Sequence, residues 1–428
     1  MEWQYILVDV CGCAGAAYLL RLIDLKTGDH LTFAHIFSVV WGACILACQI
    51  PPANRNPPEL ITIVVLIAGW WAFLTGALLV LQKPLPVKIP IYSVRRRPAT
   101  IVLWTLVALH VFTWSLEAPP FAHAGITSVR DIAAFLSAIR VRHLYEVEIP
   151  WYLKFVRSGF VYYFPLALIM RRKGWLSRGV LALILCGGGL LTLVKFTRAP
   201  LLWATVVLYV SWMVLYRPGV KRCVLTAGLL VFAFTSLFFW MQTFVVDEGL
   251  VMQGTHTVLD GYFGGTMRAY ESILRGEYPP SDGWYSLDMV NYVLKKLGFI
   301  FAYPELVRDY GTNPTNLYTF LDAYTLDFGI PGAVIGAFVT GAFAAFTYRR
   351  MRCSRRVSAL TIYVTVTFFC VMSIANNEFI RNTLLMMTVF VVPLDFALAG
   401  RSADRYRREA PGIPGRVRLA SVVGGSRS

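Results

Sequence analysis

The sequence predicts an all-α, polytopic integral membrane protein with about eleven transmembrane helices and one large extracytoplasmic loop. Of the 428 residues, 57% are hydrophobic and 15% are charged, whereas soluble domains carry about 25% charged residues. Apolar runs long enough to cross a bilayer recur along the chain, and the mean hydropathy is +0.59. Lys and Arg gather in short segments between these runs. We therefore treat residues 1–428 as a single membrane domain.

The expected spans are runs of about 17–25 apolar residues bounded by charged residues or proline. They cover residues 3–20, 31–50, 60–81, 99–116, 151–170, 179–194, 199–216, 223–246, 331–348, 358–375 and 382–399. The first run follows Met-Glu-Trp and lacks the basic segment of a cleaved signal peptide. We therefore expect it to remain as a span.

The basic segments predict an N-terminus outside the cytoplasm and a C-terminus inside. With this orientation, the cytoplasmic segments hold most of the 40 Lys and Arg residues, as positive-inside sorting requires. These segments are 21–30, 82–98, 171–178, 217–222, 349–356 and 400–428, the last a basic tail expected to be disordered. The net charge of +16 is thus explained by topology and predicts no nucleic-acid partner. Two long loops, 117–150 and 247–330, are left outside.

Several classes of site are disfavoured by what the sequence contains. The eight cysteines all lie outside the two long outer loops, which argues against a disulfide framework or a structural zinc site. The sequence has no His-Glu-x-x-His motif, and we expect neither a metal nor a cofactor. Asp9 and Asp395 are the clear charges inside spans, fewer than an ion-coupled transporter usually needs.

Two cations lie in the predicted outer connection between the sixth and seventh spans. Lys195 and Arg198 belong to the sequence Lys-Phe-Thr-Arg-Ala-Pro. Arg presents a planar fork suited to bidentate phosphate binding, and Lys adds a point charge. The alternative is that both side chains reach lipid headgroups. Because an outer Arg opposes positive-inside sorting, we favour phosphate binding.

A second candidate is the short outer turn before the last span, Asn-Asn-Glu-Phe-Ile-Arg at 376–381. Glu378 precedes Arg381 by three residues, so the two can form a local ion pair. They can equally supply a general base and a phosphate clamp to one cavity. The sequence leaves both interpretations open.

The large outer loop interleaves tyrosines and tryptophan with charged side chains. Two stretches, 266–275 and 287–297, have the spacing of amphipathic helices. Aromatic faces beside hydrogen-bonding groups suit sugar rings, but they also suit helices lying at the headgroup level. Its candidate residues are Asp260, Tyr262, Arg268 and Trp284.

The end of this loop carries its densest group of polar residues, including Asn316, Tyr318, Asp322 and Asp327. Apolar residues recur here at helical spacing, which predicts a short helix at the membrane surface that ends at Gly329. The next span then begins at Pro331. Asp327 is placed to cap that span or to act as a base, and both roles remain open.

Three segments carry a resemblance to a known family. Residues 315–332, TNLYTFLDAYTLDFGIPG, resemble the signature of the bacterial oligosaccharide repeat-unit polymerases, the O-antigen polymerase family. Residues 261–299 are similar to that family's outer loop. Residues 195–202, KFTRAPLL, resemble its small-residue–Arg element, although Thr precedes Arg198 where Gly or Ser is common. The resemblance covers roughly residues 195–400.

The resemblance implies a metal-independent glycosyltransferase of the bacterial inner membrane, GT-C-like in having many spans and an outer active site. It implies transfer of a growing glycan from undecaprenyl diphosphate to the non-reducing end of a new lipid-linked repeat unit, for O-antigen, capsule or exopolysaccharide. Its partners are then these lipid-linked glycans and membrane lipids, with a chain-length regulator and a flippase. The sequence leaves three alternatives, an O-antigen ligase, a polysaccharide or lipid-linked oligosaccharide transporter, and a non-catalytic scaffold for glycan export.

Roles for the candidate residues follow from this resemblance and from their chemistry. Outer arginines can stabilise the departing diphosphate without a metal, and the acceptor hydroxyl needs a base. The diphosphate is assigned to Arg198, Arg381, Arg268 and Lys195. The candidate bases are Asp327, Glu378 and Asp260. Glycan contacts are assigned to Asn316, Tyr318, Asp322, Trp284 and Tyr262.

Overall fold

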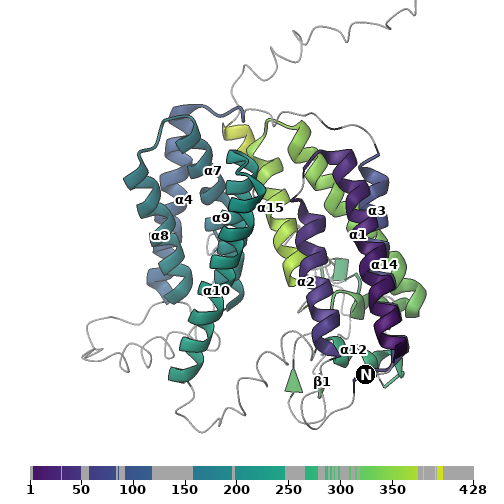
Figure 1. Cartoon of the computed structure of the whole chain (residues 1–428). Helices are drawn as coiled ribbons and strands as arrows, with labels where there is room; N and C mark the ends of the chain where they lie inside the picture. The colour runs from purple at the N-terminus through teal and green to yellow at the C-terminus, as the bar shows by residue number, and fades with distance from the viewer. Residues whose placement is uncertain are drawn as a thin grey trace, which may run out of the picture.

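The computed structural model is almost entirely helical in the part of the chain it describes (Figure 1). That part consists of residues 3–29, 31–49, 57–82, 85, 92–117, 158–194, 198–245, 266–277, 285–287, 290–291, 294, 297–298, 308–309, 314–315, 319–374, 379, 391 and 393–398. The only strands within it are the two-residue pair β1 (Arg308–Asp309) and β2 (Pro314–Thr315), which are antiparallel.

The helices fall where the apolar runs predict them. They are α1 (Trp3–Thr27), α2 (Phe33–Cys48), α3 (Leu60–Val80), α4 (Arg96–Glu117), α7 (Phe160–Arg172), α8 (Arg178–Val194), α9 (Arg198–Tyr216), α10 (Val220–Val245), α12 (Thr266–Leu274), α14 (Leu321–Cys353) and α15 (Val357–Met372). Among the described residues, four segments are long and apolar enough to cross a bilayer, namely Trp3–Thr27, Leu60–Val80, Arg96–Ser115 and Leu321–Cys353. The chain therefore carries the apolar helices of a membrane protein. The expected span 382–399 lies mostly outside the described residues.

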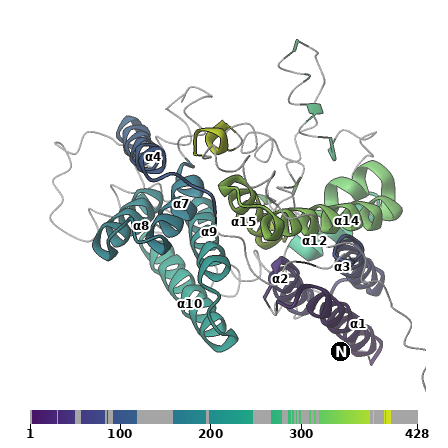
Figure 2. The ribbon, with the colours of Figure 1, turned by 90° about the horizontal axis from the view of Figure 1, so that it is seen from above.

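The helices form two groups joined by α15. Helices α1, α2, α3 and α14 pack together, and α4, α7, α8, α9 and α10 form the second group (Figures 1 and 2). Helix α15 lies between them, packing on α14 and α2 on one side and on α9 and α7 on the other. The largest helix contact is between α3 and α14.

Glycines bring the backbones of α3 and α14 into direct contact. A Cβ atom added at Gly76 would lie 2.0 Å from the carbonyl oxygen of Phe338. A Cβ added at Gly341 would lie 1.9 Å from the carbonyl oxygen of Phe73. Small residues permit this approach, which increases dispersion contacts where lipid removes the hydrophobic driving force.

The basic segments gather at one end of the bundle. Arg349, near the end of α14, donates a hydrogen bond to the carbonyl of Val80 at the end of α3, at 3.3 Å. Arg352 is buried and pairs with Asp29, which also accepts hydrogen bonds from Tyr348 and Arg217. Asp29 follows α1 and Arg217 follows α9, so this network joins the two helix groups at the basic end.

Helix α14 contains a reversal that the sequence did not predict. Gly329 has φ 65° and ψ −163°, a conformation available essentially to glycine alone. The Tyr324 ring would lie 2.4 Å from a Cβ added at Gly336, and its hydroxyl is 3.2 Å from Thr340 Oγ1. In a straight helix, residues twelve apart are about 18 Å apart. Residues 321–328 therefore fold back along 332–340 and form a re-entrant segment, the name used below.

This reversal corrects the expected surface position of the short helix. The expected end at Gly329 and restart near Pro331 are confirmed by the break in the helix. The re-entrant segment, however, is inserted between neighbouring helices, because Leu321 is fully buried against Gly69 of α3, and Phe320 just before it is fully buried against Phe37, Trp41 and Phe73. Its polar groups have hydrogen-bond partners, Thr319 for Asp322 and Tyr270 for Thr325, which makes their burial tolerable.

Candidate functional site

The candidate site lies at the end of the bundle opposite the basic segments. Helix α9 begins and α15 ends there, since Trp203 near the start of α9 stacks on Phe368 near the end of α15, with centroids 5.1 Å apart. Arg198 is the first residue of α9, five positions before Trp203. The backbone of this arginine is thus brought to the level where α15 ends.

Phe379, which lies between Glu378 and Arg381 in sequence, adjoins the same place. It packs edge-on against Phe369 of α15, with centroids 5.6 Å apart. Glu378 and Arg381 themselves lie outside the described residues.

The residue just before the re-entrant segment is bonded directly to the end of α15. The Phe320 amide donates to the carbonyl of Ser373 at 2.8 Å, immediately beyond α15. This bond links the chain entering α14 to the chain leaving α15. Three segments that are far apart in sequence therefore meet at one end of the bundle.

A buried polar layer lines the re-entrant segment. Thr319 donates a hydrogen bond from its hydroxyl to the carboxylate of Asp322, which is only 1% exposed. Tyr270 of α12 lies 2.6 Å, hydroxyl to hydroxyl, from Thr325. Burial raises the pKa of the Tyr270 phenol above its ordinary value, and the nearby Asp322 carboxylate raises it further. The phenol is thus a hydrogen-bonding group here and not an acid.

Asp327 lies at the tip of the re-entrant segment and is bonded to the outer loop. Its carboxylate accepts hydrogen bonds from the Tyr285 amide at 3.2 Å and the Ser286 amide at 2.6 Å, and a third from the Ser286 hydroxyl. The polar group at the loop's end thus holds a turn 41 residues away in sequence.

Arg275 joins α12 to the start of α3. It pairs with Glu59 at 2.8 Å, and with Glu271 one helical turn earlier. Burial raises the pKa of Glu271, and the positive charge of Arg275 partly offsets this shift. The pairing with Glu271 has the i,i+4 spacing that a sequence can show, whereas Glu59 is 216 residues away.

The described part of the site contains two of the predicted residues with their side chains, Asp322 and Asp327. Arg198 and Arg268 lie on α9 and α12, but only their backbones are described. Lys195, Asp260, Tyr262, Trp284, Asn316, Tyr318, Glu378 and Arg381 lie outside the described residues. Their assigned roles stay predictions. Ser286 and Thr325 are polar contacts of the site that the sequence reasoning did not single out.

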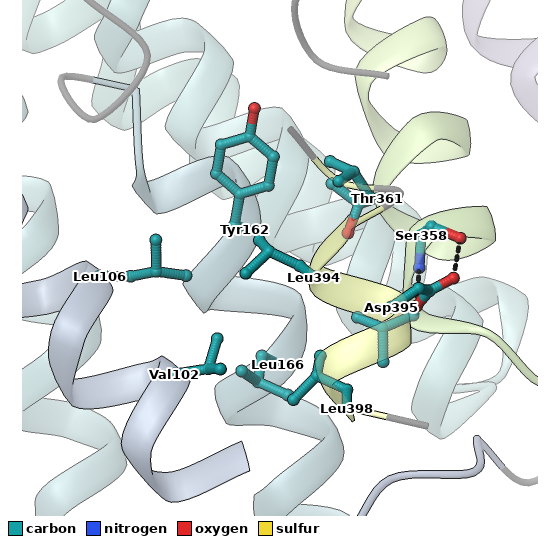
Figure 3. Close-up of a pocket in the computed structure, with 11 residues that line it drawn as sticks. Val102, Leu106, Tyr162, Leu166, Ser358, Thr361, Leu394, Asp395 and Leu398 are labelled. Carbon is teal, nitrogen blue, oxygen red and sulfur yellow. Dashed lines mark hydrogen bonds between the residues drawn. The ribbon is translucent and has the colours of Figure 1, made fainter. Parts of the chain in front are cut away.

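The two intramembrane aspartates both have partners. Gln49 donates to Asp9 at 2.8 Å. Asp395 accepts the Ser358 amide at 3.0 Å and the Ser358 hydroxyl, which caps the start of α15 (Figure 3). A small, mostly apolar pocket beside this cap is bordered by α4, α7 and α15 (Figure 3). It lies by the start of α15, away from the candidate site at its other end.

No family model, curated protein or solved structure matches the chain. Among the described residues, no three His, Cys, Asp or Glu side chains gather where they could hold a metal ion. The arrangement of the site and the sequence resemblance are therefore the basis for a proposed function.

Proposed function

We propose that this chain polymerises undecaprenyl-diphosphate-linked oligosaccharide repeat units at the outer face of the bacterial inner membrane, by metal-independent glycosyl transfer. The proposal includes about eleven spans, a GT-C-like fold and an outer N-terminus. One observation carries it. Three places in the chain adjoin the end of α15, opposite the basic end expected in the cytoplasm: the start of α9 at Arg198, Phe379 between Glu378 and Arg381 in sequence, and the chain entering the re-entrant segment that bears Asp327.

The chemistry needs positive charge on the donor and a base on the acceptor. Arg198 and Arg381 would bind the diphosphate and stabilise the charge that develops as it leaves. A carboxylate would take the proton of the attacking sugar hydroxyl. Support for the two arginines comes from the Trp203–Phe368 and Phe369–Phe379 contacts, which bring their segments to the end of α15.

The experiment is complementation of cells that lack their own repeat-unit polymerase. Arg198→Ala and Arg381→Ala, each expressed in the membrane at the wild-type level, should abolish long polymer. Arg275→Ala is the matched control, because this arginine lies at the same end and is bonded to Glu59 and Glu271. Full-length polymer from Arg198→Ala or Arg381→Ala would refute that arginine's diphosphate role.

The same cells separate the alternative activities. Loss of a ligase leaves free lipid-linked polymer of normal length, whereas loss of a polymerase leaves single repeat units. Loss of a transporter leaves the lipid-linked units on the cytoplasmic side. With purified protein and lipid-linked repeat units, polymer should also form in the presence of a metal chelator. If the wild-type protein makes no polymer in that assay, the proposed activity is refuted.

A further inference from the structure

Asp327 uses both of its carboxylate oxygens to hold one turn of the outer loop. Oδ1 accepts the Tyr285 amide, and Oδ2 accepts both the amide and the hydroxyl of Ser286. Two consecutive backbone N–H groups directed at one carboxylate fix the conformation of that backbone. Such bonds are stronger than neutral ones because the acceptor is charged.

The support beneath Asp327 is rigid. Two residues further on, Gly329 adopts its glycine-specific conformation and reverses the chain. On the preceding turn, the Tyr324 ring packs against Gly336, and its hydroxyl bonds with Thr340. The carboxylate is therefore carried on a helix end that packs against the later turns of α14.

We propose that Asp327 is a positioning residue that anchors the Tyr285–Ser286 turn to α14, and is not the general base. A base must direct an oxygen at the acceptor hydroxyl, yet each oxygen of Asp327 is directed at the protein. The residue before the turn in sequence is Trp284, a predicted glycan contact. Anchoring the turn fixes the backbone that directly follows Trp284 in sequence. The link to substrate rests on the proposed function, but the anchor itself does not.

Amide hydrogen exchange on the full-length protein in lipid nanodiscs tests the anchor without any activity. Asp327→Ala should speed exchange of the Tyr285 and Ser286 amides by about tenfold, because each loses a charge-assisted bond. Asp327→Asn keeps one acceptor oxygen and should give a smaller increase. Glu277→Gln is the control, an exposed carboxylate in the same loop whose change should leave both amides protected. Unchanged protection in Asp327→Ala overturns the anchor.

Kinetics then separate positioning from base catalysis. An anchor predicts that Asp327→Asn retains polymerisation with a raised KM for the acceptor, and that Asp327→Ala is worse. It also predicts that Ser286→Ala, which removes one of the three bonds, raises KM in the same direction. A lost base would instead lower kcat by about 10²–10⁴-fold in Asp327→Asn and leave Ser286→Ala at wild-type activity. That pattern would overturn the proposal. If wild-type protein makes no polymer, the proposed function fails while the exchange result still decides the anchor.

Discussion

Replacing Gly341 by alanine should separate α3 from α14 and destabilise the protein. The added Cβ would lie 1.9 Å from the carbonyl oxygen of Phe73, a backbone atom that cannot move aside alone. The two helices must therefore shift apart, and overpacking of this kind costs about 3 kcal/mol. Alanine regains about 1 kcal/mol of helix propensity over glycine, so the expected net loss is about 2 kcal/mol.

The assay is reversible unfolding of the purified protein in detergent, followed by tryptophan fluorescence. Gly228→Ala is the matched control, because Gly228 lies inside α10 with open space where its Cβ would be, and this change should stabilise by about 1 kcal/mol. Adding Gly76→Ala to Gly341→Ala should cost less than the sum of the single changes, since both act on one helix contact. Equal stability of Gly341→Ala and Gly228→Ala would refute the close approach.

Three further changes test other contacts by the same unfolding measurement. Asp29→Ala removes the ion pair of the 2%-exposed Arg352 and should cost about 3 kcal/mol, whereas Arg217→Ala, on a 43%-exposed side chain, should cost at most about 1 kcal/mol. Equal losses of stability from the two changes would show that burial of the arginine does not determine how much each ion pair stabilises the protein. Gly329→Ala should cost about 1–3 kcal/mol, because alanine is strained at φ 65° and ψ −163°, and a neutral result would contradict the reversal. Asp395→Ala leaves the start of α15 uncapped and should cost about 2 kcal/mol, with Asp395→Asn losing less, and identical variants would argue against the cap.

The helices could be predicted from the sequence because their signal is local. A run of apolar residues ended by charge or proline marks a buried helix wherever it lies, and α3 begins at Leu60 and ends within one residue of its expected bounds. The cations at 349–356 also gather at one end of the bundle, as their pattern indicates. The count of cations in this segment does not reveal that Arg352 is buried, because the burial of Arg352 depends on its pairing with Asp29, 323 residues away.

The position of the re-entrant segment could not be predicted from the sequence. The helical spacing of the apolar residues in 320–328 suits a helix on a membrane surface and a helix inserted between other helices equally well. The choice depends on space provided by Gly69 of α3, where an added Cβ would meet Leu321. The same limit applies to the candidate site. Asp327 stands out in sequence as a carboxylate before a helix, but its bonds to Tyr285 and Ser286 join segments whose pairing no local pattern encodes.

The glycine contact between α3 and α14 also sets an order for biogenesis. Val80 and Arg349, bonded at the end of this helix pair, are 269 residues apart. At about 5–20 residues per second, α3 enters the membrane roughly 15–50 s before its partner has been synthesised. During that interval, the face of α3 that carries Gly69 and Gly76 lies against lipid or the insertion machinery. The group of α1, α2, α3 and α14 is therefore completed only late in translation, and chains released before α14 should expose this face of α3 to quality control.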